Sequence, residues 1–146
     1  MGQLVFPPGH RIFLDSNILI YFAEDTQPYA NILAGMFESI AAGRVIAVVS
    51  SLSLLETCVF PLKKGDHAGA KRLRDLLRNS PHVEYIPITD DVLMRAAEIR
   101  ATTEIRTPDA IHVATAQICS CDVMLTNDRR LSVIDSPTVV ILNDYL

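Results

Sequence analysis

The chain has 146 residues, of which 49% are hydrophobic and 21% charged, and its formal net charge is −4. This size and balance predict one globular domain, residues 1–146, with a sizeable core. The negative charge argues against a protein that binds nucleic acid through a broad basic surface, because phosphate contacts need Lys and Arg along the backbone of the nucleic acid. Any contact with nucleic acid must therefore be local.

The sequence also argues against a membrane span, a signal peptide and a cysteine framework. The longest apolar run, residues 45–59, is interrupted by polar side chains and falls short of the ~20 apolar residues of a membrane span. The N-terminus lacks the basic start of a signal peptide. The three cysteines, Cys58, Cys119 and Cys121, have neither the number nor the spacing of a disulfide framework or a zinc site. We expect a soluble, cytoplasmic protein.

The first half of the chain is predicted to form two strands separated by helices. Residues 11–15 predict a strand, and residues 16–23, apolar on all sides, predict a short buried helix. Residues 28–42 have the 3.6-residue period of an amphipathic helix closed by Gly43; in a dimer this apolar stripe could instead be shared with a partner subunit. Residues 45–50 predict the second strand.

The second half continues the alternation. A helix is predicted from about 66 to 80, with Leu73, Leu76 and Leu77 facing inward, followed by a strand at 83–88 and a helix from 89 to about 105. The runs at 122–126 and 138–142 complete the set of strands. Several strands are continuously apolar, as in parallel sheets covered on both faces. The pattern predicts a three-layer α/β/α domain with a mostly parallel sheet of about five strands.

Four acidic residues lie near the ends of the predicted strands or at the start of a predicted helix. Asp15 ends the first strand, Glu56 lies one or two helical turns after the second, Asp109 opens the helix that leads into the fourth, and Asp128 follows the fourth. In open α/β sheets, functional groups collect beyond the carboxyl ends of the strands. We therefore expect the four carboxylates near one edge of the sheet.

Each acidic residue also has a structural interpretation. Asp15 suits a turn and Asp128 a helix cap, while Ser53 to Glu56 fits a capping box and Thr107-Pro108-Asp109 fits a helix start. Taken together the four are harder to explain in this way, because clustered carboxylates repel one another and raise one another's pKa values. A hard cation would neutralise them, and oxygen-only ligands suit Mg²⁺ or Mn²⁺.

Four segments in this order, "FLDSNILIYF", "VVSSLSLLETCV", "RTPDAIHVATA" and "MLTNDRRL", resemble the acidic motifs of the PIN-domain family, most closely those of the small VapC-type toxin ribonucleases. The resemblance implies a ribonuclease dependent on Mg²⁺ or Mn²⁺, with Asp15, Glu56, Asp109 and Asp128 as catalytic residues and metal ligands. It implies supporting roles for Asn17 and Thr126. It also implies an antitoxin whose C-terminal segment covers the active site, and a homodimer.

The implied reaction is hydrolysis of an RNA phosphodiester by a metal-activated water. Arg129 and Arg130 could contact RNA, or one of them could balance the acidic cluster, and His112 is expected to be structural or supporting. The basic residues of segment 63–78 could bind phosphates or form an ordinary solvated helix face. Two rivals stay open: a non-catalytic PIN domain that serves as a binding module, and a phosphoryl-transfer domain, which would favour a second acidic residue at the position of Asn17.

Overall fold

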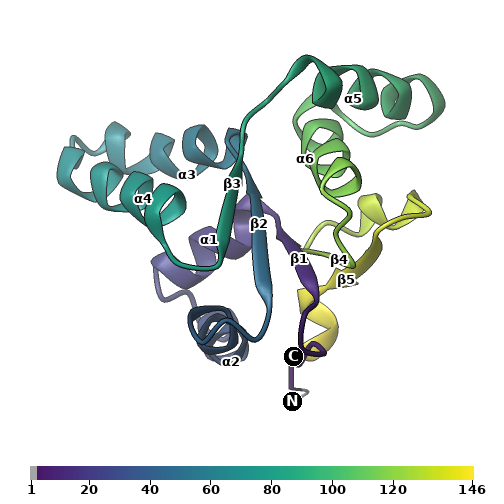
Figure 1. Cartoon of the computed structure of the whole chain (residues 1–146). Coiled ribbons are helices and arrows are strands. Elements are labelled where there is room, and N and C mark those ends of the chain that lie inside the picture. The colour runs from purple at the N-terminus through teal and green to yellow at the C-terminus, as the bar shows by residue number, and fades with distance from the viewer. Residues whose placement is uncertain (1–2) are drawn as a thin grey trace.

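The computed structural model describes residues 3–146 (Figure 1). Its strands are β1 (Arg11–Leu14), β2 (Ile46–Ser50), β3 (Val83–Ile86), β4 (Val123–Thr126) and β5 (Thr138–Ile141). Its α-helices are α1 (Ser16–Ala23), α2 (Tyr29–Ala41), α3 (Leu52–Lys63), α4 (His67–Asn79), α5 (Asp90–Thr102) and α6 (Thr107–Ile118). Two short 3₁₀ helices, η1 (Arg129–Val133) and η2 (Leu142–Tyr145), follow β4 and β5.

The five strands form one sheet in the order β3-β2-β1-β4-β5, and every pair is parallel. The strands lie where the apolar runs predicted them, with ends that differ by at most two residues. The predicted parallel sheet is therefore confirmed. Its order reverses direction at β1, because β2 and β3 lie on one side of this strand and β4 and β5 on the other.

Successive residues of the central strands face opposite layers, which is the geometry of any strand. Ile12 and Leu14 pack into one buried cluster with side chains of α1 and α2, while Phe13 packs into a second cluster with α5 and α6. Figure 1 shows these two pairs of helices on either side of the sheet. The predicted three-layer α/β/α arrangement is confirmed. Because helices cover both faces of the sheet, the strand residues that point to either face are apolar.

Some details of the helices differ from the predictions. The helix expected to run to about 105 ends at Thr102, and residues 103–106 form a loop before α6. Of the three leucines of α4 that were expected to face inward, only Leu77 is buried, at 3% exposure, whereas Leu73 is half-buried and Leu76 is 49% exposed. Most of the apolar stripe of α2 packs into the chain's own core, while Phe37 is only partly buried, so the sharing of this stripe with a partner subunit stays a prediction.

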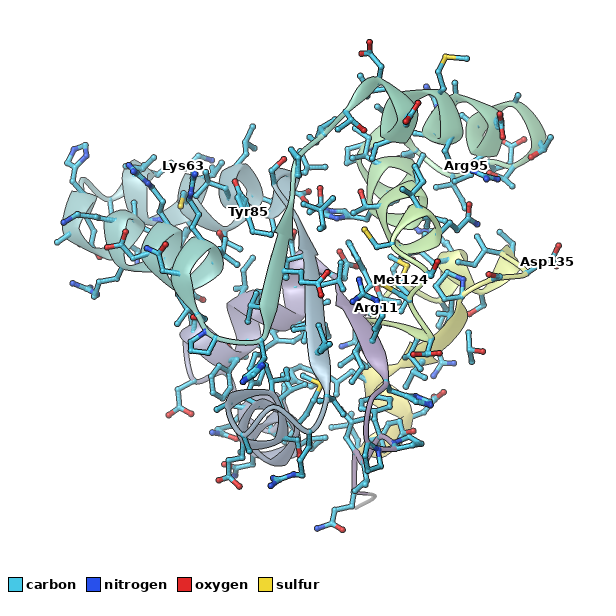
Figure 2. All side chains as sticks on the ribbon, in the orientation of Figure 1. Arg11, Lys63, Tyr85, Arg95, Met124 and Asp135 are labelled. Atoms are coloured by element: carbon cyan, nitrogen blue, oxygen red, sulfur yellow. The ribbon has the colours of Figure 1, made fainter. Side chains whose placement is uncertain are left out.

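Arg11 links strands that are not neighbours (Figure 2). Its guanidinium donates two hydrogen bonds, of 2.8 and 2.9 Å, to the carboxylate of Glu84 on β3, and its Nε donates to the backbone oxygen of Cys119 at 3.0 Å. This bidentate pair lies across β2 and connects one edge of the sheet to its centre.

None of the helices within residues 3–146 is both long and apolar enough to cross a membrane. All three cysteines have free thiols.

Candidate active site

The strand order reverses between β1 and β4, and open α/β sheets bind ligands beyond the carboxyl ends of the strands at such a reversal. Asp15 lies there, because it directly follows β1 and caps the N-terminus of α1. Its Oδ1 accepts a hydrogen bond from the backbone N–H of Ser16 at 2.8 Å, and its Oδ2 accepts one from Thr126 Oγ1 at 2.6 Å. With 7% exposure, the carboxylate is buried but hydrogen-bonded through both oxygens.

Thr126 joins Asp15 to Asp128. It ends β4, and its Oγ1 also accepts a hydrogen bond from the backbone N–H of Asp128 at 3.0 Å. Asp128 caps η1 and forms an ion pair with Arg130, with 2.7 Å between Oδ2 and Nη2. The hydrogen bonds from the Arg130 side chain are the main reason that the pKa of Asp128 is lowered. A supporting contact of the kind predicted for Thr126 is thus present.

Asp109 approaches the same place from the first turn of α6. Its pKa is raised, first by burial and then by the negative charges of Asp15 and Asp128. His112 and Arg130 oppose this rise with weaker effects. Three carboxylates from separate parts of the chain therefore share one electrostatic environment, and among the described residues Asp109 has no hydrogen-bond partner for its side chain.

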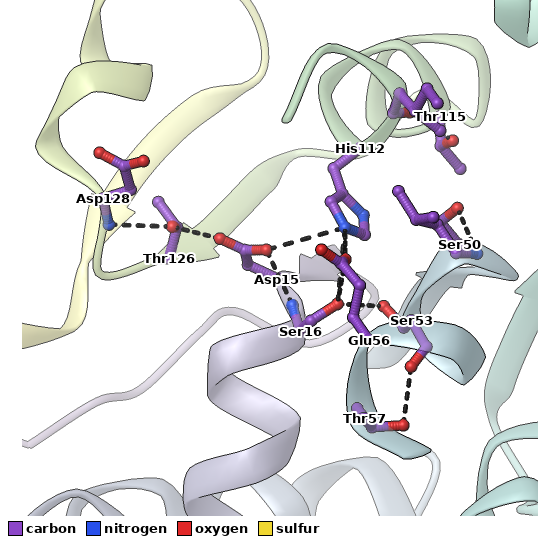
Figure 3. Close-up of polar contacts among 12 residues, drawn as sticks. Asp15, Ser16, Ser50, Ser53, Glu56, Thr57, His112, Thr115, Thr126 and Asp128 are labelled. Atoms are coloured by element: carbon purple, nitrogen blue, oxygen red, sulfur yellow. Dashed lines mark hydrogen bonds and ion pairs between the residues drawn. The ribbon is translucent and has the colours of Figure 1, made fainter. Parts of the chain in front are cut away.

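Glu56, on α3, is held by two donors from other helices (Figure 3). Its Oε1 accepts hydrogen bonds from His112 Nε2 at 2.5 Å and from Ser16 Oγ at 2.8 Å. The contact with His112 is the main reason that the pKa of Glu56 is lowered. The capping box predicted for this segment is wrong, because the helix begins at Leu52, one residue before Ser53, and Ser53 Oγ instead contacts Ser16 Oγ at 2.8 Å.

His112 is the side chain that connects Glu56 to the rest of the site. It lies one helical turn after Asp109, is 1% exposed, and has its Nε2 4.0 Å from Asp15 Oδ1. Because a carboxylate oxygen can only accept, Nε2 carries the proton in the contact with Glu56. Ser16 is the other connection, and its only signal in the sequence was its position directly after Asp15.

The remaining predicted residues lie less centrally. Asn17 is exposed on α1, and within residues 3–146 its side chain has no hydrogen-bond partner, so its supporting role stays a prediction. Arg129 pairs with Asp144, and Arg130 pairs with Asp128. One of the two basic residues thus does balance an acidic residue of the site.

The chemistry of the four carboxylates favours a metal ion, whereas their arrangement in this structure does not form a closed metal site. The four carboxylates supply the oxygen atoms that Mg²⁺ and Mn²⁺ prefer. In the described part of the chain, however, no group of three or more acidic, histidine or cysteine side chains is arranged closely enough to hold a cation. The four carboxylates do lie near one edge of the sheet: three share one environment, and Glu56 is attached to it through Ser16 and His112. Holding an ion would require some of these side chains to turn toward it.

A three-layer parallel α/β domain with carboxylates at the reversal between β1 and β4 is the arrangement that the resemblance to PIN domains implies. A model of the PIN domain family matches residues 12–137, and the chain belongs to this family. The resemblance predicted from the four motifs is confirmed. None of the curated proteins matches the chain.

Solved structures with the same fold include a toxin–antitoxin complex and a toxin. A toxin–antitoxin complex from Klebsiella pneumoniae is 24% identical with a TM-score of 0.68, covering 90% of this chain and 97% of that chain. VapBC2 from Rickettsia felis, bound to a fragment of promoter DNA, is 19% identical with a TM-score of 0.70, covering 90% and 98%. VapC20 from Mycobacterium tuberculosis, a toxin that cleaves the sarcin-ricin loop, is 17% identical with a TM-score of 0.63, covering 86% and 90%. At these identities the likeness establishes the fold.

Proposed function

We propose that this protein is an endoribonuclease dependent on a divalent metal ion, and the toxin of a toxin–antitoxin pair. The observation that carries the proposal is the shared environment of Asp15, Asp109 and Asp128, in which burial and the two neighbouring carboxylates raise the pKa of Asp109. A fold that gathers like charges at the ligand-binding edge of its sheet has a use for a cation there. Membership of the PIN domain family and the toxin–antitoxin proteins among its structural neighbours support the same conclusion.

The carboxylates of Asp15, Asp109 and Asp128 would hold the metal ion, with Glu56 at the border of the site. When bound, Mg²⁺ or Mn²⁺ neutralises charge on phosphoryl oxygens and lowers the pKa of water. Thr126 and the backbone of Ser16 fix the orientation of the Asp15 carboxylate. His112 and Ser16 fix Glu56, whose lowered pKa keeps it ionised and able to accept a proton or orient a water.

Cleavage of RNA by the purified protein tests this proposal. The wild type should cleave RNA in Mg²⁺ or Mn²⁺ and stop in EDTA, and Asp15→Asn or Asp109→Asn should abolish cleavage. Asp75→Asn is the matched control, because Asp75 is exposed on α4 and distant in sequence from every residue of the site. Full activity in EDTA, or in either site variant, would contradict the mechanism.

One observation favours a second function, that of a non-catalytic PIN domain acting as a binding module. Glu56 and Asp128 are already paired with nitrogen donors of the chain itself, and no close metal-holding group is found among residues 3–146. This alternative expects no cleavage of any RNA and no rise in Tm with Mn²⁺. A rise in Tm with Mn²⁺ that Asp109→Asn removes would favour the enzyme.

An apolar groove of about 460 Å³ between α1, α2 and α4 supports an antitoxin partner. Phe22 and Leu76, which line it, are partly exposed, and such a groove suits the apolar face of a helix from another protein. Co-expression with the product of a short neighbouring gene should yield a stable complex. Leu76→Glu should weaken that complex, whereas Ile118→Glu, at an exposed apolar side chain on α6, should leave it intact.

A homodimer is the second proposed assembly, through a face other than α2. Helix α3 exposes Leu55, Val59 and Phe60, and α5 exposes Leu93 and Met94. These side chains are large and apolar, and burial against a second copy would remove them from water. Light scattering should give a dimer for the wild type and a monomer for Leu55→Glu.

A further inference from the structure

A pocket of about 520 Å³ opens beside Asp109. It lies between the loop that joins α5 to α6, the first turn of α6, and η1. Its apolar lining comes from Ile105, Leu131 and Val133, and its charged lining from Glu104, Arg106 and Arg130 in addition to Asp109. The pocket is thus continuous with the candidate active site through one of its carboxylates.

The wall of this pocket is held in place by side-chain hydrogen bonds. Arg100 donates through Nε to the backbone oxygen of Ile105 at 3.4 Å and through Nη1 to Thr107 Oγ1 at 2.9 Å. Thr103 Oγ1 donates to the backbone oxygen of Ile99 at 2.7 Å and accepts from the N–H of Ile105 at 3.2 Å. The loop that ends α5 early is therefore a fixed surface, so little ordering is needed when a ligand binds.

Arg106 is the basic side chain of this pocket that has no partner. It is exposed, and within residues 3–146 it has no side-chain hydrogen bond or ion pair. Arg130, by contrast, is paired with Asp128, and Arg129 is paired with Asp144. In a protein with a net charge of −4, an unpaired guanidinium beside the candidate site is the favoured place for a phosphate.

We propose that this pocket binds one nucleotide of single-stranded RNA next to the cleaved phosphodiester, with the base against Ile105 and Val133 and a phosphate on Arg106. The proposal rests on the proposed nuclease function and adds a substrate-binding subsite to it. Unstacked bases bind to apolar and guanidinium surfaces through their flat faces, while Arg contacts the backbone. Glu104 carries a negative charge on the same wall, so the phosphate is expected on the side of Arg106.

Binding of RNA to a variant that cannot cleave tests the subsite. In the Asp15→Asn background with Mg²⁺ present, fluorescence anisotropy would measure the affinity for a fluorescein-labelled single-stranded RNA of seven uridines at several salt concentrations. Adding Arg106→Gln should reduce the slope of log K against log salt by about 0.7, the value for one phosphate contact on a single strand. Arg44→Gln is the matched control, because Arg44 is exposed and lies before β2, at the opposite end of the sheet.

The base is tested with RNAs in which each uridine in turn is replaced by an abasic residue. One position should weaken binding about tenfold. Val133→Asp, at a side chain that is 64% exposed and can be changed without disturbing the core, should weaken binding of the intact RNA and abolish this dependence on position.

The outcomes separate the subsite from the function. An unchanged salt slope in Arg106→Gln, or an abasic profile that Val133→Asp leaves unaltered, overturns the subsite while wild-type cleavage of RNA upholds the nuclease. A wild type that neither cleaves nor binds RNA overturns both. A melting temperature equal to that of the parent shows that each variant is folded.

Discussion

Replacing Ser16 with alanine should destabilise the protein more than the loss of a single hydroxyl at an exposed position would. Ser16 is buried, and its hydroxyl has a single proton, which it donates to the acceptor-only carboxylate of Glu56 at 2.8 Å. Ser53 must then be the donor in the 2.8 Å contact between the two serine hydroxyls. Ser16 therefore satisfies a carboxylate and a buried hydroxyl at once.

The expected cost follows from these two contacts. A hydrogen bond to a charged group contributes about 1.5–3 kcal/mol, and a buried hydroxyl left without a partner costs about 1–3 kcal/mol. Water reaches the partly exposed Glu56 and replaces part of the first contact, whereas Ser53 is fully buried. Ser16→Ala should lower the free energy of unfolding by about 2–3 kcal/mol.

Urea denaturation in buffer with EDTA would measure this loss for Ser16→Ala, Ser53→Ala and the double variant. The double variant should be no less stable than Ser16→Ala, because removing both hydroxyls leaves none unsatisfied. Asn17→Ala is the control, since this neighbouring side chain is exposed and its loss should cost less than about 0.5 kcal/mol. A cost below about 0.5 kcal/mol for Ser16→Ala, or simple additivity of the two serine variants, would refute the reasoning.

Three further predictions concern charge. Asp109→Asn should raise Tm in EDTA, because the raised pKa of Asp109 shows that its charged form is disfavoured in the folded protein, and a decrease would contradict this. Because the pKa of Glu56 is lowered in the folded protein, its ionised carboxylate stabilises the fold above the ordinary value of 4.5, and this stability is lost as the pH falls through the folded pKa. Urea denaturation below pH 4.5 should therefore show a shallower pH dependence in Glu56→Gln than in the wild type. Arg11→Met should lower the free energy of unfolding by about 1 kcal/mol, because it removes the bidentate pair with Glu84. Arg95→Met, which removes an exposed ion pair of 3.7 Å with Glu98, should change it very little in the same urea denaturation assay. Equal losses in the two variants would argue against the link across the sheet.

The parts of the fold that could be predicted are those encoded by neighbouring residues. Apolar runs predicted all five strands, and several of these runs are continuous because strands covered on both faces have no polar side. Asp15 stood out for the same reason: a carboxylate at the end of such a run marks the end of the strand. Parallel pairing then places the ends of β1 and β4 together, which is why Asp15 and Asp128 were expected at one edge.

The parts that could not be predicted depend on contacts between distant residues. Ser16 meets Ser53, 37 positions away, and His112 lies 56 positions from Glu56, and no local pattern encodes either pairing. The early end of α5 has a similar cause, because Thr103 and Arg100 bond to the loop backbone and offer it an alternative to the helix. Arg129 looked available for RNA only because Asp144, its partner, is 15 positions further along the chain.

The four carboxylates have different hydrogen-bond partners, and we therefore expect them to contribute unequally to the binding of a cation. Asp15 already accepts two hydrogen bonds, while Glu56 and Asp128 have donors that lower their pKa values. Asp109 has a raised pKa, and no donor within residues 3–146 reaches it. A cation would therefore relieve an unfavourable charge at Asp109, whereas at Glu56 it would have to compete with a hydrogen bond that is already made. Loss of Asp109 should accordingly weaken metal binding more than loss of Glu56, a ranking that titration of Mn²⁺ into the two amide variants can measure.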